Sequence, residues 1–157
     1  MAQEIERKFL VTGNQWKTLA TGIVYRQGYL SRARQRTVRV RTIGNKGFIA
    51  VKGVTIGASR LEFEYEIPFE DCCQMLDVLA QKPLIVKKRY SIPFAGLVWE
   101  VDDFSGDNEG LVIAEVELES EGQSYVKPDW AGQEVTGDSR YYNSNLVAYP
   151  YKLWSNG

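Results

Sequence analysis

The segment RLEFEYEI, residues 60–67, alternates a charged side chain with an apolar or aromatic one along its whole length. Successive side chains of a β-strand point to opposite faces, so this period of two predicts a strand with one charged face and one apolar face. The same alternation, with similar enrichment in β-branched and aromatic residues, recurs at residues 3–11, 24–30, 36–43, 46–53, 84–92, 96–104 and 110–119. The chain is therefore predicted to hold about eight strands.

Turn signals rich in glycine, proline and polar residues separate these segments, at residues 44–45, 53–59, 93–96 and 105–110. Helical periodicity is rarer. It predicts one helix at residues 70–81, which ends before Pro83, and shorter helical pieces at 14–20 and 138–148. Many antiparallel strands with few helices are typical of a barrel or a sandwich.

The composition is that of one globular domain spanning residues 1–157, with 44% hydrophobic and 25% charged residues. The chain lacks the stretch of about 20 apolar residues that a membrane helix needs. Its N-terminus, MAQEIERK, lacks the apolar core of a signal peptide. We therefore expect a cytoplasmic protein without a membrane partner. The net charge of −1 argues against general nucleic-acid binding.

Histidine is absent from the sequence. Its absence excludes catalytic triads and dyads that use a histidine base, and zinc sites with histidine ligands. Cys72 and Cys73 are adjacent, which fits neither a disulfide framework nor zinc-ligand spacing, so we expect them to have a packing role. Any bound metal would therefore be held by carboxylates, which favours Mg²⁺, Mn²⁺ or Ca²⁺.

Charged residues of one sign stand two positions apart on several predicted strands and therefore share a face. The runs are Glu4 and Glu6 before Lys8; Arg39 with Arg41; Glu62, Glu64 and Glu66; Lys87 with Arg89; Glu100 with Asp102; and Glu115, Glu117 and Glu119. Like charges on one face of a sheet repel, so the fold gains no stability from these runs. A solvated outer face explains one such strand, but six strands call for a common cause.

If the sheet closes into a barrel, one of its faces becomes a confined interior. Charges in that interior would be costly unless they met metal ions or a polyanion. Carboxylates at alternate strand positions can reach one Mg²⁺ together, and the planar fork of arginine makes two hydrogen bonds to a phosphate. The pattern therefore favours an interior site for a phosphate-rich anion with a divalent metal. An interaction barrel with a charged outer face is the alternative.

The pattern Glu4-x-Glu6-x-Lys8, in the context EIERKFLV, resembles the signature of the CYTH superfamily, also called triphosphate tunnel metalloenzymes. Further motifs occur in the family's order and at fitting spacing: QGYLS (27–31), RVR (39–41), Lys52, RLEFEYEIP (60–68), KKRY (87–90), WEVDDFSGDNEGLVIAEVELESE (99–121), PDWAGQEVTGDSRYYNSNL (128–146) and Lys152. The resemblance covers essentially the whole chain and is greatest to the compact bacterial members.

This resemblance implies a mainly β (α+β) fold, a closed antiparallel eight-stranded β-barrel that forms a tunnel, with a few flanking helices. It implies metal ligands at Glu4, Glu6, Asp102, Glu115 and Glu117. It implies triphosphate-binding cations at Lys8, Arg39, Arg41, Lys52, Lys87, Arg89, Arg140 and Lys152. Glu62 and Glu64 fit the family's acidic strand that orders a metal or the attacking water. With Lys8 and Lys87 they are the predicted catalytic residues. We expect Glu66, Glu100, Glu119 and Arg34 to be ordinary surface charges.

The predicted activity is hydrolysis of the terminal phosphoryl group of a triphosphate, with one or two Mg²⁺ or Mn²⁺ ions as cofactors. Inorganic tripolyphosphate, cleaved to pyrophosphate and phosphate, is the first choice of substrate because no pocket for an organic group is recognisable. Within the family, adenylate cyclase and thiamine or nucleoside triphosphatase are the alternatives. Outside enzymes, the alternative is a polyphosphate- or nucleotide-binding module. The expected partner is the small triphosphate itself, and a homodimer is left open.

Overall fold

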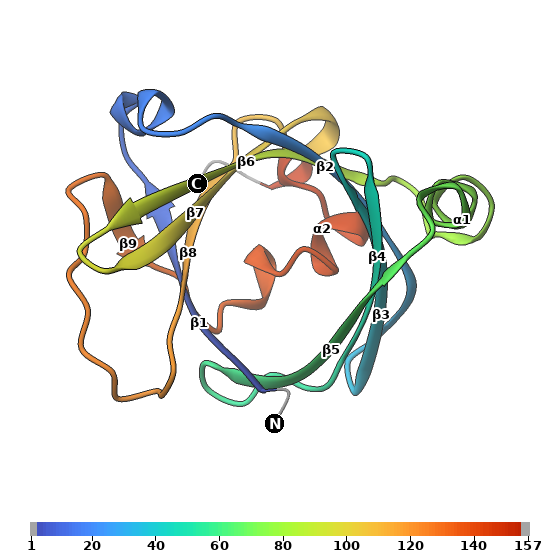
Figure 1. Ribbon diagram of the computed structural model, residues 1–157, viewed down its shortest axis with the longest axis horizontal. Helices are drawn as coiled ribbons and strands as arrows, with labels where there is room; N and C mark the ends of the chain where they lie inside the picture. Colours follow the sequence, from blue (N-terminus) through green and yellow to red (C-terminus); the bar gives the residue numbers. More distant parts are fainter. Residues whose placement is uncertain (1–2, 155–157) are drawn as a thin grey trace.

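The computed structural model describes residues 3–154, and its strands wind into a ring (Figure 1). Eight strands make the ring: β1 (Gln3–Val11), β2 (Ile23–Ala33), β3 (Arg36–Ile43), β4 (Lys46–Lys52), β5 (Ser59–Ile67), β6 (Ile85–Phe94), β7 (Leu97–Phe104) and β8 (Val112–Glu117). They are hydrogen-bonded in the order β5-β4-β3-β2-β6-β7-β8-β1, and β5 pairs back with β1. Every pairing is antiparallel. The prediction of a mainly β fold built on eight antiparallel strands in a closed ring is confirmed.

Strand β1 closes the ring by using different residues for different neighbours. Its first three residues, from Gln3 to Ile5, pair with β5, and Glu6 to Leu10 pair with β8. Farther along, Phe9 and Val11 pair with a ninth strand, β9 (Ala131–Glu134). The sequence prediction missed β9 because AGQE shows no alternation of apolar and polar residues. Its place is decided by pairing with β1 and by the neighbouring Trp130, which is buried.

The apolar faces of the strands point outward, and other segments cover them. Around β1, β7 and β8, the buried residues Phe9, Trp99 and Trp130 form a cluster with ring centroids 5.4 Å and 6.0 Å from Trp99. Such aromatic pairs contribute roughly 0.5–1.5 kcal/mol beyond their buried area. The 3₁₀ turn η1 (Gln15–Thr18) adds the buried Trp16. This cluster lies outside the ring. A second apolar cluster, with Ile85, Phe104 and Ile113, shares the inner faces of β6, β7 and β8 with the charged side chains, which line the rest of the interior.

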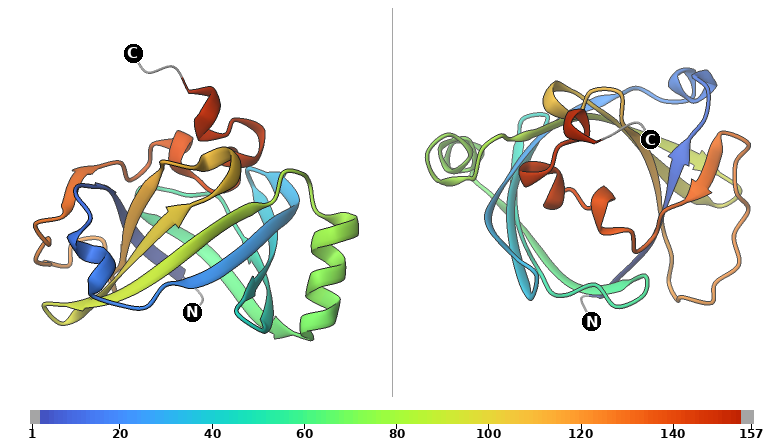
Figure 2. Two further views of the ribbon diagram at one scale, coloured as in Figure 1. Left: turned by 90° about the horizontal axis from the view of Figure 1, so that it is seen from above. Right: turned by 180° about the vertical axis from the view of Figure 1, so that it is seen from behind.

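On the opposite side, helix α1 (Phe69–Gln74) and the π-helical turn η2 (Met75–Leu79) stand against β3 and β4 (Figure 2). Cys72 and Leu76 are fully buried there against Val40. Gly47 makes room for this contact, since a Cβ at that position would lie 2.6 Å from the Cβ of Cys72. The packing role predicted for Cys72 is confirmed, and the helix predicted at residues 70–81 is present.

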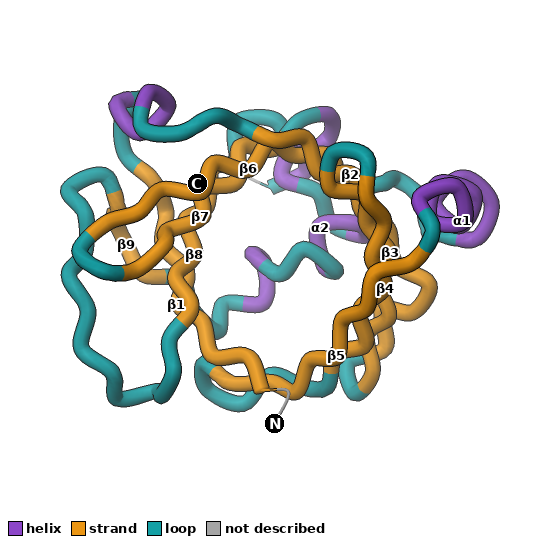
Figure 3. Tube along the Cα trace, viewed as in Figure 1, coloured by secondary structure: helices purple, strands orange, loops and turns teal. Residues whose placement is uncertain are grey.

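The C-terminal part differs from the single helix predicted at residues 138–148. It is broken into η4 (Ser139–Tyr141), α2 (Asn145–Ala148) and η5 (Tyr151–Leu153). The break lies at residues 142–144, where Asn143 turns inward to bond with Lys87 of β6. The segment crosses one opening of the ring (Figures 1 and 3). Tyr141 and Leu146 anchor it in a buried cluster. A further 3₁₀ turn, η3 (Gly106–Asn108), joins β7 to β8.

None of the helices in the described part of the chain is long and apolar enough to cross a membrane.

Candidate active site in the barrel interior

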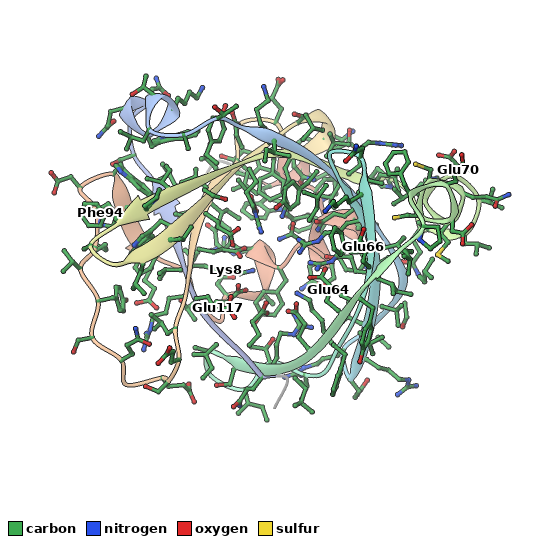
Figure 4. The ribbon with its side chains drawn as sticks, in the orientation of Figure 1. Lys8, Glu64, Glu66, Glu70, Phe94 and Glu117 are labelled. Atoms are coloured by element: carbon green, nitrogen blue, oxygen red, sulfur yellow. The ribbon has the colours of Figure 1, made fainter. Side chains whose placement is uncertain are left out.

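A cavity of about 220 Å³ lies inside the ring. Among the described residues, its lining includes seven cationic and seven carboxylate side chains. The cations are Lys8, Arg39, Arg41, Lys52, Arg60, Lys87 and Arg89; the carboxylates are Glu4, Glu6, Glu62, Glu64, Glu100, Glu115 and Glu117. Lys8, Glu64 and Glu117 can be seen around the opening, whereas Glu70 on α1 lies outside (Figure 4). The charged faces predicted from the alternation therefore meet in one confined space.

Strand register places opposite charges beside each other. Lys8 on β1 is paired with Glu115 on β8, and Lys52 on β4 with Glu62 on β5. Their charged atoms lie 3.8 Å and 3.1 Å apart. Cross-strand neighbours of opposite charge attract, so the like-charge repulsion along each strand is offset by the strand beside it.

Arg39 on β3 reaches past β4 to Glu64 on β5, and the two side chains are 3.1 Å apart. The residue between them in the register is Ala50, which is small enough to leave the path open. Arg41 bonds to the same carboxylate at 3.2 Å. Its guanidinium also lies 5.2 Å from the ring centre of Tyr25, an arrangement that favours a cation. Arg39 and Arg41 thus present two neighbouring guanidinium groups, which could bind an anionic ligand as well as Glu64.

Lys87 and Arg89 on β6 share the carboxylate of Asp102 on β7. Arg89 grips it with two hydrogen bonds of 2.7 Å and 2.8 Å, and Lys87 Nζ lies 2.7 Å from Oδ2. Asp102 is 1% exposed and is not among the residues that line the cavity. This geometry does not place Asp102 with the carboxylates predicted to bind metal. Its oxygens are taken by the two cations, which it holds toward the cavity.

Burial changes the charge state of the carboxyl groups on β1. It raises the pKa of Glu4 to about 9, with help from the nearby Glu6, and that of Glu6 to about 7, with help from Glu115. Burial acts in the same direction on Glu62, but contact with Glu4 and the charge of Lys52 outweigh it and hold the pKa of Glu62 at about 2. At neutral pH Glu4 therefore holds a proton, Glu6 is close to half-protonated and Glu62 is ionised.

The same residues fit a divalent metal. Oε1 of Glu4 and Oε2 of Glu62 are buried and accept no hydrogen bond, although Lys52 Nζ lies 3.7 Å and 3.1 Å from them. Oxygen donors of this kind are what Mg²⁺ and Mn²⁺ prefer. Within residues 3–154, no group of three or more His, Cys, Asp or Glu side chains is gathered at metal-binding spacing. A metal bound here would displace the protons held by Glu4 and Glu6.

The stability of the metal-free protein is expected to fall as the pH rises from about 5 to about 7.5. In this window the folded protein holds protons on Glu4 and Glu6 that the unfolded chain, with carboxyl pKa values near 4.5, has released. A group whose pKa is raised by folding stabilises the folded state at low pH, and this contribution is lost as the pH rises through the folded pKa. The low pKa of Glu62 acts below this window, and the lowered pKa of Lys87, about 8, acts above it.

Thermal melting in the presence of a chelator measures this slope. The double substitution Glu4→Gln and Glu6→Gln should flatten it. Glu66→Gln, at an exposed position of β5, should leave it unchanged. A melting temperature of the parent protein that is flat or rises across the window would contradict the assignment.

Two predicted phosphate ligands lie outside the cavity. Arg140 is exposed and bonds to the neighbouring Asp138, with a closest contact of 2.8 Å. Lys152 is exposed and pairs with Asp107 at 3.0 Å. Neither lines the cavity. The structure therefore does not bring these two side chains together with the other predicted cations.

Other residues of the cavity were missed or assigned to the surface by the sequence analysis. Glu100 was expected to be an ordinary surface charge but lines the cavity, where it lies 3.4 Å from Arg89. Its position two residues before Asp102 on the same strand could have indicated that the two side chains share a face. Arg60 also lines the cavity and bonds to the carbonyl of Gly53 at 3.0 Å. Tyr142 and Asn143 come from the crossing segment, and no strand periodicity could have indicated them.

Comparison with known proteins agrees with this arrangement. A family model for the CYTH domain matches residues 2–147. An inorganic triphosphatase from Acetivibrio thermocellus is 55% identical over 152 residues, covering 97% of each chain. An inorganic triphosphatase from Nitrosomonas europaea is 36% identical over 152 residues, covering 92% of this chain and 96% of that protein.

Among solved structures, the crystal structure of an inorganic triphosphatase superposes with a TM-score of 0.66 at 32% identity, covering 100% of this chain and 99% of the other. The ring topology, the charged interior and the match of the family model over nearly the whole chain lead to one assignment. The chain belongs to the CYTH domain family.

Proposed function

We propose that this protein is a metal-dependent inorganic triphosphatase that hydrolyses tripolyphosphate to pyrophosphate and orthophosphate. The observation that carries the proposal is the equal number of cationic and carboxylate side chains, seven of each, in a cavity of about 220 Å³. With every carboxyl group ionised, as metal binding requires, an anion entering alone would leave the confined space with excess negative charge, and a metal entering alone would leave excess positive charge. The two are therefore expected to bind together.

The cations suited to the phosphates are Lys8, Arg39, Arg41, Lys52, Lys87 and Arg89. The two arginines of β3 form one donor group and the β6 pair another, so a chain of phosphates can bridge from one to the other. Arginine provides paired hydrogen bonds to phosphate oxygens, and lysine provides point charges. Inorganic triphosphatases at 55% and 36% identity support the choice of the inorganic substrate.

The residues that would hold the metal, Mg²⁺ or Mn²⁺, are Glu4, Glu6, Glu115 and Glu117, which line the cavity from β1 and β8. When bound, the metal would neutralise phosphate charge and act as a Lewis acid on the transferring group. Glu6 and Glu117 are directly opposite each other in the register of β1 and β8, so both carboxylates face the same part of the cavity.

In the proposed reaction, a water oxygen forms a bond to the terminal phosphorus while the bond from that phosphorus to the bridging oxygen breaks. The electron pair of the broken bond remains on pyrophosphate, and a proton of the water passes to the solvent or to a product phosphate. We assign to Glu62 and Glu64 the hydrogen bonds that this water donates. To Lys8 and Lys87 we assign the stabilisation of the charge that develops on the leaving pyrophosphate. Positioning and electrostatics account for most of the catalysis in such transfers.

A panel of phosphate-release assays tests the function. It should include tripolyphosphate, pyrophosphate, thiamine triphosphate and ATP, each with Mg²⁺ or Mn²⁺ and with a chelator. We expect metal-dependent phosphate release to be fastest with tripolyphosphate, with pyrophosphate as the other product. Cyclic AMP as the main product from ATP would replace the proposal with a cyclase. Binding of tripolyphosphate with background release under every metal would replace it with a binding module.

A further inference from the structure

The ammonium group of Lys87 is held from two directions. Asp102 Oδ2 on β7 lies 2.7 Å from Nζ, and Asn143 Oδ1 on the crossing segment accepts a hydrogen bond of 2.9 Å from it. An ammonium group has three N–H donors. Two of them are therefore directed at protein acceptors. The third is available to a ligand in the cavity that Lys87 lines, beside the ring of Phe104, whose centre lies 5.5 Å from Nζ.

Asn143 is itself fixed by a neighbour on β2. Its Oδ1 accepts a second hydrogen bond from Nε2 of Gln27 at 3.1 Å, and Gln27 is fully buried. Next to it, the ring of Tyr142 lies 5.3 Å from Lys8 Nζ. Two adjacent residues of one segment thus contact the two lysines that are proposed to stabilise the leaving group. The segment is anchored on both sides, by Tyr141 and Leu146 in a buried cluster.

We propose that Asn143 is a positioning residue, which orients the free N–H of Lys87 toward the oxygen that leaves with pyrophosphate. The proposal rests on the proposed triphosphatase function. The C-terminal segment then does more than cover the opening of the ring. Its Asn143 fixes the orientation of the ammonium group of Lys87, a residue of β6. Asp102 fixes one direction of the ammonium group and neutralises charge, while the neutral amide of Asn143 fixes the other.

The effect should be felt in kcat more than in KM. Substrate phosphates are bound by several cations, so the affinity for the substrate depends little on the direction of one N–H group. Negative charge on the bridging oxygen grows only as the bond to phosphorus breaks, and an interaction that strengthens there accelerates the chemical step.

Three variants separate positioning from folding. Asn143→Ala should lower kcat for tripolyphosphate about 10-fold, with KM changed less than about 3-fold. Asn143→Asp keeps the acceptor oxygen, so it should keep most of kcat but raise KM, since an added carboxylate repels the polyanion. Asn145→Ala is the matched control. Asn145 lies on the same segment and bonds to the carbonyl of Ser139 at 2.8 Å, and this variant should retain both constants.

A double-substitution cycle then asks whether Asn143 acts through Lys87. In a Lys87→Met background, Asn143→Ala should cause no further loss of kcat, because the group that it orients is gone. Equal losses in the two backgrounds would show a merely structural role and overturn the proposal. A higher KM with an unchanged kcat in Asn143→Ala would also overturn the proposal.

Nuclear magnetic resonance of the lysine ammonium groups gives a reading that is independent of activity. Lys87→Arg identifies the Lys87 signal. This signal should be sharp in the parent protein and in Asn145→Ala, and broadened or lost in Asn143→Ala. An unchanged signal in Asn143→Ala overturns the positioning role even in an active enzyme. If the signal is lost in Asn143→Ala but the parent protein does not hydrolyse tripolyphosphate, the contact orients Lys87 as inferred, whereas the proposed function, and the catalytic role of Asn143 with it, is refuted.

Discussion

Asp102→Asn is expected to destabilise the protein by about 3–5 kcal/mol, because it removes the negative partner of two buried cations. Asp102 is 1% exposed, and its two oxygens are bound by Arg89 and Lys87 at 2.7–2.8 Å. Without its charge, both cations would remain in the interior with less compensation, and breaking one side of a buried ion pair costs more than the pair contributes when intact. Urea unfolding at neutral pH, with the midpoint and slope both fitted, measures the loss.

The neighbouring residue provides a matched control. Asp103 is on the same strand but faces outward, and its carboxylate lies 4.0 Å from Lys17 in a pair that is open to solvent. Exposed pairs of this kind contribute about 0–1 kcal/mol, so Asp103→Asn should be close to neutral. If Asp102→Asn cost no more than Asp103→Asn, the Lys87–Asp102–Arg89 cluster would not have the structural role assigned to it. Asp102 would then again be a candidate metal ligand.

The second large effect is expected from Arg39→Ala, which should lower kcat/KM for tripolyphosphate by roughly 10²–10³-fold. Arg39 is 6% exposed and lines the cavity, where its guanidinium bonds to Glu64 at 3.1 Å. Its loss removes a planar donor for phosphate and leaves Glu64 with only Arg41 as a partner. Arg39→Lys should recover part of the activity, because lysine keeps the charge but cannot form the paired hydrogen bonds. Steady-state phosphate release at constant ionic strength provides the measurement.

Arg36→Ala serves as the control for Arg39, since Arg36 opens the same strand but is exposed at the hairpin between β2 and β3. It changes the net charge by the same amount, and kcat/KM should stay within about two-fold of the parent value. A matching small effect at Arg39 would mean that the interior arginines do not bind the substrate. The interaction-barrel interpretation would then gain support.

Much of the site was predictable because strand periodicity is a local property. Alternation in a segment such as RLEFEYEI fixes which side chains share a face, whatever the rest of the chain does. The residues of β1, β3, β5, β6 and β8 that were selected in this way lie together around the cavity. Glu100 was expected at the surface but lines the cavity, because periodicity gives the face of a residue but not how far it lies from an open end of the ring.

The positions of the predicted residues that do not line the cavity have a different physical origin. Arg140 and Lys152 were expected from their order in the chain, but the C-terminal segment has no periodicity that would fix its direction. Its path is set by tertiary contacts, including the bond from Lys87 to Asn143 and the packing of Leu146. Asp102 was predicted to bind metal, but its oxygens are bound by Arg89 and Lys87. Its contacts with Arg89 and Lys87 depend on the register of β6 with β7, which the sequence does not express.

By itself, the sequence determined the period-two strands, the charged face of each strand and the carboxylate-only chemistry that follows from the absence of histidine. These features depend on residues that are close together along the chain. Only the tertiary structure decided that the charged faces point into a closed ring, that Lys8 and Lys52 stand between pairs of carboxylates, and that Asn143 reaches Lys87. Each of these depends on ring closure and strand register, which are set by contacts between residues far apart in the chain.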